Sequence, residues 1–87
     1  MLKLRAKVSI SQTDDGAVLL DERGGRYWEL NGSAAQVLRT LLDHGSVEKA
    51  VTALTDRYPV SVTDATRDVT ELVGQLRSAE LIVEEPA

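Results

Sequence analysis

The chain has 87 residues, which is the length of one small domain. A hydrophobic fraction of 43% and a charged fraction of 28% are ordinary for a soluble globular protein, and they exclude a disordered chain and a disulfide scaffold. Fourteen acidic and ten basic residues give a net charge of −4, and the chain after its basic first residues is more acidic still. Because proteins hold phosphate backbones largely through Lys and Arg, this balance argues against a nucleic acid partner.

The chain has no cysteine and one histidine, which excludes thiol redox chemistry, cysteine nucleophiles and zinc sites built from cysteine or several histidines. No apolar run is long enough for a membrane span or a secretory signal. The sequence therefore predicts a cytoplasmic protein with no metal, no cofactor and no membrane partner.

The first third of the chain predicts three strands. Apolar and polar residues alternate strictly over residues 4–11, which is the pattern of a strand with one buried face. A turn at residues 14–16 leads to a second strand over residues 17–21. Glycines at 24–25 form the next turn, and a third strand covers residues 26–30. Such short connections predict an antiparallel meander.

After the third strand, the apolar residues take the period of helices. The first helix is expected to begin at a capping box formed by Ser33 and Gln36, and to end at Gly45. Ser46 is expected to cap a second helix, which ends before Pro59. The connection between the two helices allows only a sharp turn.

A third helix is expected to begin at Ser61 or Thr63. Residues 81–83 follow as a short extended segment, and residues 83–87 are expected to be a frayed acidic tail. The elements together predict a single domain over residues 1–87, of α+β class, in which a three-stranded antiparallel sheet is followed by three helices as in a winged helix-turn-helix. The three apolar stripes are Ala34, Val37, Leu38, Leu41 and Leu42, then Val47, Ala50, Val51, Leu54 and Tyr58, then Ala65, Val69, Leu72, Val73 and Leu76.

A winged helix raises the possibility of DNA binding, in which the third helix would enter the major groove. A helix that reads DNA normally carries an excess of cations. The predicted third helix instead has more acidic than basic side chains, namely Asp64, Asp68 and Glu71 against Arg67 and Arg77. DNA binding is therefore the less favoured interpretation.

Residues suited to catalysis have simpler structural interpretations. His44 lies in the last turn of a helix, where a cation interacts favourably with the helix dipole, and it has no evident nucleophile or orienting partner. Asp14 and Asp15 precede a glycine and are typical turn formers. The glycines within residues 22–26 lack the Lys-Ser or Lys-Thr of a phosphate loop, so this segment predicts a hairpin loop. The sequence therefore predicts no enzyme.

The third predicted strand carries two neighbouring aromatic residues, Tyr27 and Trp28. Alternation places Trp28 on the core face with Leu30, and Tyr27 and Glu29 on the opposite face. Taken alone, the pair fits a core residue beside an ordinary surface residue. The strand is also the edge of the meander, where unpaired backbone groups can accept another strand.

The third predicted helix offers a second wall beside this edge strand. Asp68, Gln75 and Ala79 flank its apolar stripe next to Leu72. A groove between the strand and this flank would take an extended peptide by strand addition, with backbone pairing for affinity and pockets for specificity.

The ordered set of these features resembles the PqqD family over residues 4–83. The resemblance rests on Leu20-Asp21, the glycine turn, the run Tyr27-Trp28-Glu29-Leu30-Asn31-Gly32-Ser33-Ala34, Val37-Leu38, Leu41-Leu42-Asp43, Val47-Glu48-Lys49-Ala50, Leu54, Tyr58, Asp68-Val69, Leu72 to Leu76, and Leu81. Glu80 departs from the pattern, because family members often have glycine before the final leucine. Gly74 lies within the third helix, where glycine costs about 1 kcal/mol relative to alanine.

The resemblance implies a precursor recognition element, a small domain that binds the leader of a ribosomally synthesised and modified peptide. The leader would be held as an added strand between the third strand and the third helix. The chain is most similar to stand-alone members of lasso-peptide clusters, which act as peptide chaperones and deliver the precursor to a leader peptidase; a macrolactam-forming cyclase is a further candidate partner. A chaperone of pyrroloquinoline quinone biosynthesis is the alternative.

The resemblance also implies which residues bind the leader. The backbone of residues 26–30 would pair with it. The leader would also contact one flank of the third helix, either the flank of Asp68 and Gln75 or the opposite flank of Thr66, Thr70 and Arg77. Leaders in such clusters typically carry a Tyr and a Pro, which apolar and aromatic pockets suit. The full expected site is Arg26, Tyr27, Trp28, Glu29, Leu30, Asp68, Val69, Leu72, Val73, Gln75 and Leu76.

Overall fold

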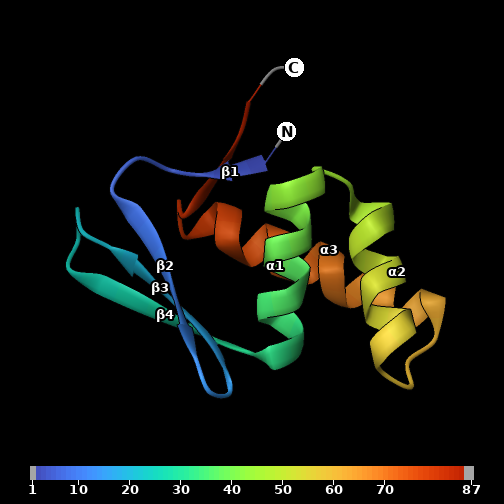
Figure 1. Cartoon of the computed structure of the whole chain (residues 1–87). Coiled ribbons are helices and arrows are strands. Elements are labelled where there is room, and N and C mark those ends of the chain that lie inside the picture. Colours follow the sequence, from blue (N-terminus) through green and yellow to red (C-terminus); the bar gives the residue numbers. More distant parts are fainter. Residues whose placement is uncertain (1, 86–87) are drawn as a thin grey trace.

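The computed structural model describes residues 2–85 of the chain. Its elements in chain order are β1 (Leu2–Leu4), β2 (Val8–Thr13), β3 (Gly16–Asp21), β4 (Arg26–Asn31), α1 (Gly32–His44), α2 (Val47–Arg57), α3 (Val62–Ser78) and β5 (Ile82–Glu84). Strands β2, β3 and β4 form an antiparallel sheet in that order, and the three helices follow it (Figure 1). The predicted α+β, winged helix-turn-helix-like fold is confirmed.

The sheet turns one face toward the helices. Leu19 of β3 lies opposite Ile10 on β2 and Trp28 on β4, and its side chain is 0% exposed. Because side chains alternate along a strand, Leu20 and its partner Tyr27 face the other way and are both exposed. The predicted assignment of Trp28 to the inner face and Tyr27 to the outer face is therefore confirmed.

The single strand predicted over residues 4–11 is wrong, because the chain forms two strands there. Lys7 has a φ of 66°, and the Val8 amide donates to the Arg5 carbonyl at 3.1 Å, so the chain turns between β1 and β2. The Arg5 amide donates instead to the Leu81 carbonyl at 3.0 Å. The alternation did not reveal this turn, because Leu4 packs against the same core as Val8 on either side of it.

Strand β1 pairs with β5 in a separate two-stranded antiparallel sheet, so the two ends of the described chain lie side by side (Figure 1). Residues 83 and 84 belong to β5, and the prediction that they are frayed is wrong, because they pair with Lys3 and Leu2. Lys3 also forms an ion pair with Glu85 at 2.8 Å. Residues 86–87 of the predicted tail lie outside the described residues.

The helix ends agree with the sequence except at the start of α1. Asn31 caps α1, since its side chain accepts a hydrogen bond from the Ala34 amide at 2.9 Å. The predicted capping box is wrong because Ser33 donates its hydroxyl to Asn31 at 3.0 Å, while the Gln36 amide nitrogen reaches the Ala53 carbonyl at 3.5 Å. The cap of α1 therefore lies two residues earlier than predicted, at Asn31 rather than Ser33.

The other predicted caps are confirmed. Gly45 has a φ of 67° and its amide donates to the Leu41 carbonyl, which ends α1. Ser46 accepts from the Lys49 amide at the start of α2, and Ser61, rather than Thr63, caps α3. The joint between α1 and α2 is thus a turn of two residues.

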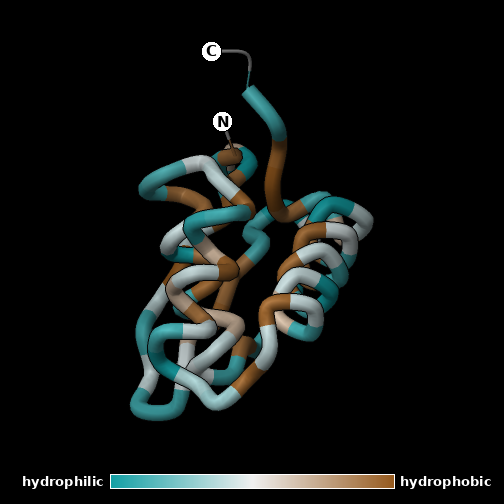
Figure 2. Tube along the Cα trace, turned by 90° about the vertical axis from the view of Figure 1, so that its right-hand side faces the viewer, coloured by the Kyte–Doolittle hydropathy of each residue, from teal (hydrophilic) through white to brown (hydrophobic). Residues whose placement is uncertain are grey.

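The three helices bury their apolar stripes against one another and against the inner face of the sheet. Hydrophobic and hydrophilic residues alternate along the helices as expected of amphipathic helices (Figure 2). Val47 departs from its predicted stripe and is 42% exposed, because it is the first residue of α2. The most deeply buried side chains are Leu19, Leu38, Leu41, Leu76 and Val69.

Over residues 2–85, none of the helices has the length and apolar composition needed to cross a membrane. The same residues contain no group of three or more His, Cys, Asp or Glu side chains that could hold a metal ion.

Candidate functional site

Strand β4 is an edge of the three-stranded sheet, and its hydrogen-bonding direction can be worked out from the register. The Glu22 amide donates to the Lys7 carbonyl at 3.0 Å, which continues the pairing of β3 with β2. Because backbone groups alternate in direction along a strand, the next residues of β3 bond to β4, and Trp28 lies in such a bonded pair. The backbone N–H and C=O groups of Tyr27 and Glu29 therefore point away from the sheet.

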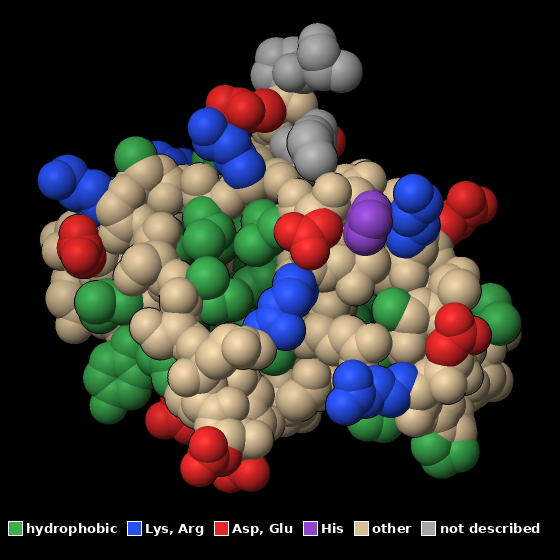
Figure 3. All heavy atoms as spheres, in the orientation of Figure 1, with side chains coloured by type: hydrophobic (Ala, Val, Ile, Leu, Met, Phe, Trp, Pro, Cys, Tyr) green, Lys and Arg blue, Asp and Glu red, His purple; other side chains and the backbone are tan. Residues whose placement is uncertain are grey.

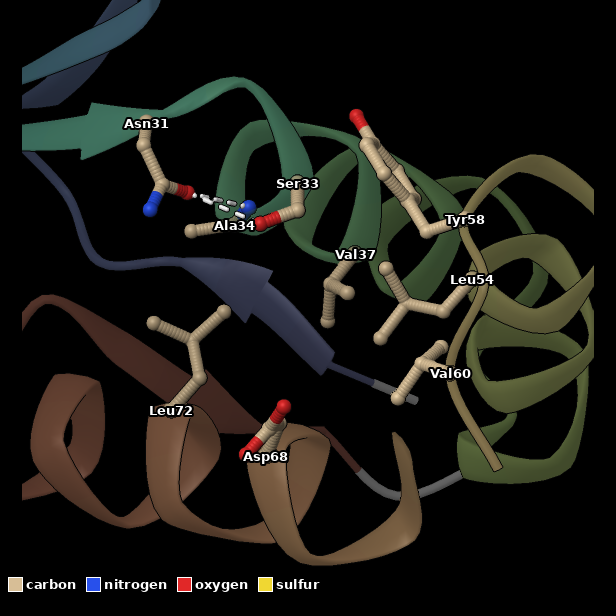
Figure 4. Close-up of a pocket in the computed structure, with 9 residues that line it drawn as sticks. All are labelled: Asn31, Ser33, Ala34, Val37, Leu54, Tyr58, Val60, Asp68 and Leu72. Atoms are coloured by element: carbon tan, nitrogen blue, oxygen red, sulfur yellow. Dashed lines mark hydrogen bonds between the residues drawn. The ribbon is translucent and has the colours of Figure 1, made fainter. Parts of the chain in front are cut away.

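The flank of α3 beyond this edge carries two cavities. The first has a volume of about 350 Å³ and lies at the junction of β4, α1 and α3. In Figure 4, Asp68 and Leu72 point from α3 toward Ala34 and Val37 of α1. The full lining is Asn31, Ser33, Ala34, Val37, Leu54, Tyr58, Val60, Asp68 and Leu72.

The second cavity has a volume of about 680 Å³ and lies between the start of β4 and the last turns of α3. Trp28 supplies its aromatic wall, which explains why this inward-facing side chain is still 39% exposed. The full lining is Arg26, Trp28, Glu71, Gly74, Gln75, Ser78, Ala79 and Glu80. Gly74 borders open space on the rim, since a Cβ added there would meet no atom within 4 Å.

The two cavities follow one flank of α3 from Asp68 to Ala79. At 1.5 Å per residue this flank is about 16 Å long, which matches about five residues of an extended strand. The cavities therefore form one groove, called the β4–α3 groove below, with an unpaired strand edge on one side and a helix flank on the other.

The opposite flank of α3 is exposed and carries polar side chains that bond within the chain. The hydroxyls of Thr66 and Thr70 donate to carbonyls one turn earlier in the helix, at 2.7 and 2.8 Å. Arg77 reaches Glu84 of β5 at 3.5 Å. Both cavities thus lie on the flank that carries Asp68 and Gln75.

Asp68 places a carboxylate beside the mainly apolar walls of the first cavity. Within residues 2–85, its side chain has no hydrogen-bond or ion-pair partner, whereas Asn31 on the facing wall is engaged by Ser33 and Ala34. The Asp68 carboxylate is therefore free to accept a hydrogen bond from a molecule in the groove.

The expected site residues fall into three groups by position. Five line the groove, namely Arg26, Trp28, Asp68, Leu72 and Gln75. The side chains of Tyr27 and Glu29 are exposed on the outer face of the sheet. Leu30, Val69 and Leu76 are buried in the core and Val73 packs partly buried against it, so these four shape the groove from beneath.

Sequence reasoning missed several lining residues. Glu71 and Ser78 follow the helical spacing of Asp68 and Gln75, so this spacing was a usable signal. Tyr58 and Val60 come from the connection between α2 and α3, and no local pattern indicates that it folds over the cavity.

A separate hollow lies at the other edge of the sheet, between β2 and α1, and Figure 3 shows hydrophobic side chains gathered on that face. Its lining is Ile10, Gln12, Arg39, Leu42 and Asp43, and it shares no residue with the β4–α3 groove.

An ion pair between Asp21 and Arg23 stabilises the hairpin that leads into β4. Asp21, at the end of β3, is 3% exposed and accepts hydrogen bonds from the Arg23 backbone amide, Nε and Nη2 at 3.0 to 3.1 Å. The side-chain hydrogen bond from Arg23 holds the pKa of Asp21 below its usual value, against the opposing effect of burial.

Two solved structures share this architecture. A protein described as "Lasso peptide synthetase B1 complexed with the leader peptide" has a TM-score of 0.88 and 42% identity, over 95% of this chain and 98% of that one. A second, "TbiB1 in Complex with the TbiA(beta) Leader Peptide", has a TM-score of 0.82 and 27% identity, over 98% and 99%.

No curated protein sequence gives a significant match to the chain. The family model described as "Coenzyme PQQ synthesis protein D (PqqD)" matches residues 16–82, which covers β3, β4, the three helices and the groove between β4 and α3. The resemblance seen in the sequence is thus confirmed, and the chain belongs to the PqqD family.

Proposed function

We propose that this chain binds the leader region of a ribosomally synthesised precursor peptide and acts as a peptide chaperone without catalysis of its own. The observation that carries the proposal is the β4–α3 groove, in which an unpaired strand edge faces a helix flank across two cavities. The same architecture, at 42% identity, belongs to a lasso peptide synthetase B1 in complex with a leader peptide.

Strand addition explains how one groove binds a peptide whose core varies. The outward backbone groups of Tyr27 and Glu29 would pair with the leader backbone, which gives affinity that is independent of side chains. Alternate leader side chains would then point toward α3 and enter the cavities beside Trp28 and Leu72.

The first cavity favours one class of anchor. Its walls are mainly apolar, and Asp68 offers a carboxylate acceptor at its edge. A leader tyrosine meets both conditions, because its ring is apolar and its hydroxyl donates a hydrogen bond. The leader Tyr and Pro that the family resemblance implies would therefore bind along this half of the groove.

The bound leader would be presented to a separate leader peptidase, and a macrolactam-forming cyclase would then close the ring. This step can be tested with a full-length lasso precursor and mass spectrometry. The chain alone should leave the precursor mass unchanged, and it should accelerate leader removal when the peptidase of the same pathway is added. Cleavage by the chain alone would contradict the non-catalytic assignment.

Trp28 is the only tryptophan and lines the groove, so its emission reports binding directly. We expect the leader peptide of the 42%-identical synthetase to shift this emission, while the core peptide of the same precursor leaves it unchanged. Calorimetric binding with an unchanged spectrum would contradict the placement in the groove, and absence of binding would contradict the function.

The alternatives give different outcomes in the same assay. A chaperone of pyrroloquinoline quinone biosynthesis, which the family description favours, would bind that pathway's precursor in preference to a lasso leader. A winged-helix DNA-binding protein would shift the electrophoretic mobility of nonspecific duplex DNA at low salt. The acidic charge balance of the chain argues against such binding.

A further inference from the structure

The two walls of the β4–α3 groove are joined at one end by a single arginine. The Nη2 atom of Arg23, in the loop before β4, donates to the Glu80 carbonyl oxygen at 2.9 Å, just after the end of α3. The two residues are 57 positions apart in the chain, and Glu80 itself lines the second cavity. This bond therefore spans the groove at its Trp28 end.

Each partner of this bond is held rigidly. Arg23 is anchored by its hydrogen bonds to buried Asp21, so one guanidinium serves both β3 and the end of α3. The Glu80 carbonyl is fixed by a Schellman turn, in which the Glu80 amide donates to Arg77 and the Leu81 amide to Leu76, both at 3.0 Å. The bond therefore sets the distance between the loop before β4 and the end of α3.

Arginine suits this role better than lysine. Its planar guanidinium can donate to a carboxylate with two nitrogens and still present a further N–H to a carbonyl, whereas a lysine ammonium is a single point charge on a flexible stem. The carbonyl groups at the end of α3 also carry the negative end of the helix dipole, which favours a cation there.

We propose that Arg23 is a positioning residue that sets the width of the β4–α3 groove by holding the start of β4 against the end of α3. The inference rests on the proposed leader binding and assigns to Arg23 no contact with the leader. Without the bond, the free protein samples wider grooves, and the leader binds only the fraction that has the correct width.

The test uses Arg23→Ala and Arg23→Lys in the full chain. If the bond keeps the groove at its binding width, a fall of the competent fraction to about a tenth raises the Kd for the leader about tenfold in calorimetry. The free variants should also show stronger acrylamide quenching of Trp28, because the wall opposite this side chain has moved away. Arg23→Lys keeps a cation beside Asp21, so it serves if the alanine variant fails to fold.

Arg67→Ala is the matched control. It removes an arginine of α3 that pairs with Asp64 at 2.8 Å and lines neither cavity, so affinity and quenching should stay at the wild-type values. Folded Arg23 variants with undiminished affinity would overturn the inference while leaving leader binding itself intact. Lost affinity with unchanged Trp28 quenching would also overturn it, since Arg23 would then act by direct contact.

Discussion

Asp68 lines the groove with a side chain that can accept a hydrogen bond from the leader. Its exposed carboxylate borders the first cavity and has no partner within the described residues. We expect Asp68→Ala to weaken the affinity for the leader several-fold, because it removes a hydrogen-bond acceptor. Its free energy of unfolding should change by less than about 0.5 kcal/mol, as at most exposed positions. Calorimetry and thermal melting measure the two effects separately.

Two controls locate this effect. Glu48→Ala removes a carboxylate from the exposed surface of α2, away from both cavities, and should leave affinity unchanged. Thr70→Ala changes the other flank of α3 and should also be silent. If Thr70 mattered and Asp68 did not, the leader would lie on the opposite side of this helix.

Glu80 shows how a departure from the family pattern is accommodated. Its φ of 60° is the left-handed conformation that glycine adopts freely, so the turn after α3 keeps its geometry with a side chain present. That conformation costs a non-glycine residue about 1 to 2 kcal/mol in the folded protein. Glycine avoids this cost, but its greater conformational entropy favours the unfolded chain by about 0.4 to 1 kcal/mol. We expect Glu80→Gly to stabilise the protein by about 0.5 to 1 kcal/mol in urea unfolding.

Lys7, with a φ of 66°, gives an independent check, since Lys7→Gly should act in the same direction. The bond from Arg23 uses the Glu80 backbone carbonyl, so Glu80→Gly should retain this bond. A destabilised Glu80→Gly variant would show that the glutamate side chain contributes more than its backbone strain costs.

At the scale of elements, the edge of β4 gives the strictest test of strand addition. The Glu29 amide points away from β3, so proline there removes a donor that the sheet does not use. We expect Glu29→Pro to keep its fold, by circular dichroism, and to lose leader affinity. The matched control is Gln12→Pro, which removes an outward amide from β2, the other edge of the sheet, and should leave affinity unchanged.

An unfolded Glu29→Pro variant would mean that its amide bonds to β3, which would reverse the direction deduced from the register. A folded variant with wild-type affinity would contradict strand addition at this position. The two results are separable because folding is measured before any peptide is added.

The elements themselves follow from periodicity and turn chemistry, and so were predictable. Stripes at helical spacing placed all three helices, and Gly45, Ser46 and Ser61 marked their ends. The break at Lys7 was not predictable, because a positive φ at lysine leaves no trace in an alternation that continues across it. The pairing of β1 with β5 depends on tertiary packing of two segments from opposite ends of the chain.

The groove was predictable only in part for the same reason. The face of the sheet on which Trp28 lies follows from the two-residue period of a strand. The flank that carries Asp68 and Gln75 follows from the 3.6-residue period of a helix. The approach of Tyr58 and the bond from Arg23 to Glu80 join segments whose separation only the folded chain defines. Local patterns therefore identify the walls of the site, and tertiary contacts determine their spacing.

At the scale of the whole molecule, buried Asp21 links acid stability to the architecture of the site. Its pKa is lowered in the folded state, chiefly by the hydrogen bond from Arg23, so its carboxylate stabilises the fold fully above its unfolded pKa of about 4. This stabilisation is lost as the pH falls through the lower, folded-state pKa. We expect the stability difference between wild type and Asp21→Asn to be greater near neutral pH than below about pH 4 in urea unfolding.

Asp64→Asn is the matched control for this acid dependence, because Asp64 also pairs with an arginine, at 2.8 Å, but on the exposed face of α3. Such surface pairs contribute about 0 to 1 kcal/mol, so its difference from wild type should be small throughout. An Asp21→Asn difference that persisted unchanged into acid would show that the asparagine disturbs packing rather than charge. A difference that shrinks with acid would instead show that the Asp21–Arg23 pair holds the hairpin of β3 and β4 through ionisation, and with it the end of the groove that Arg23 bridges.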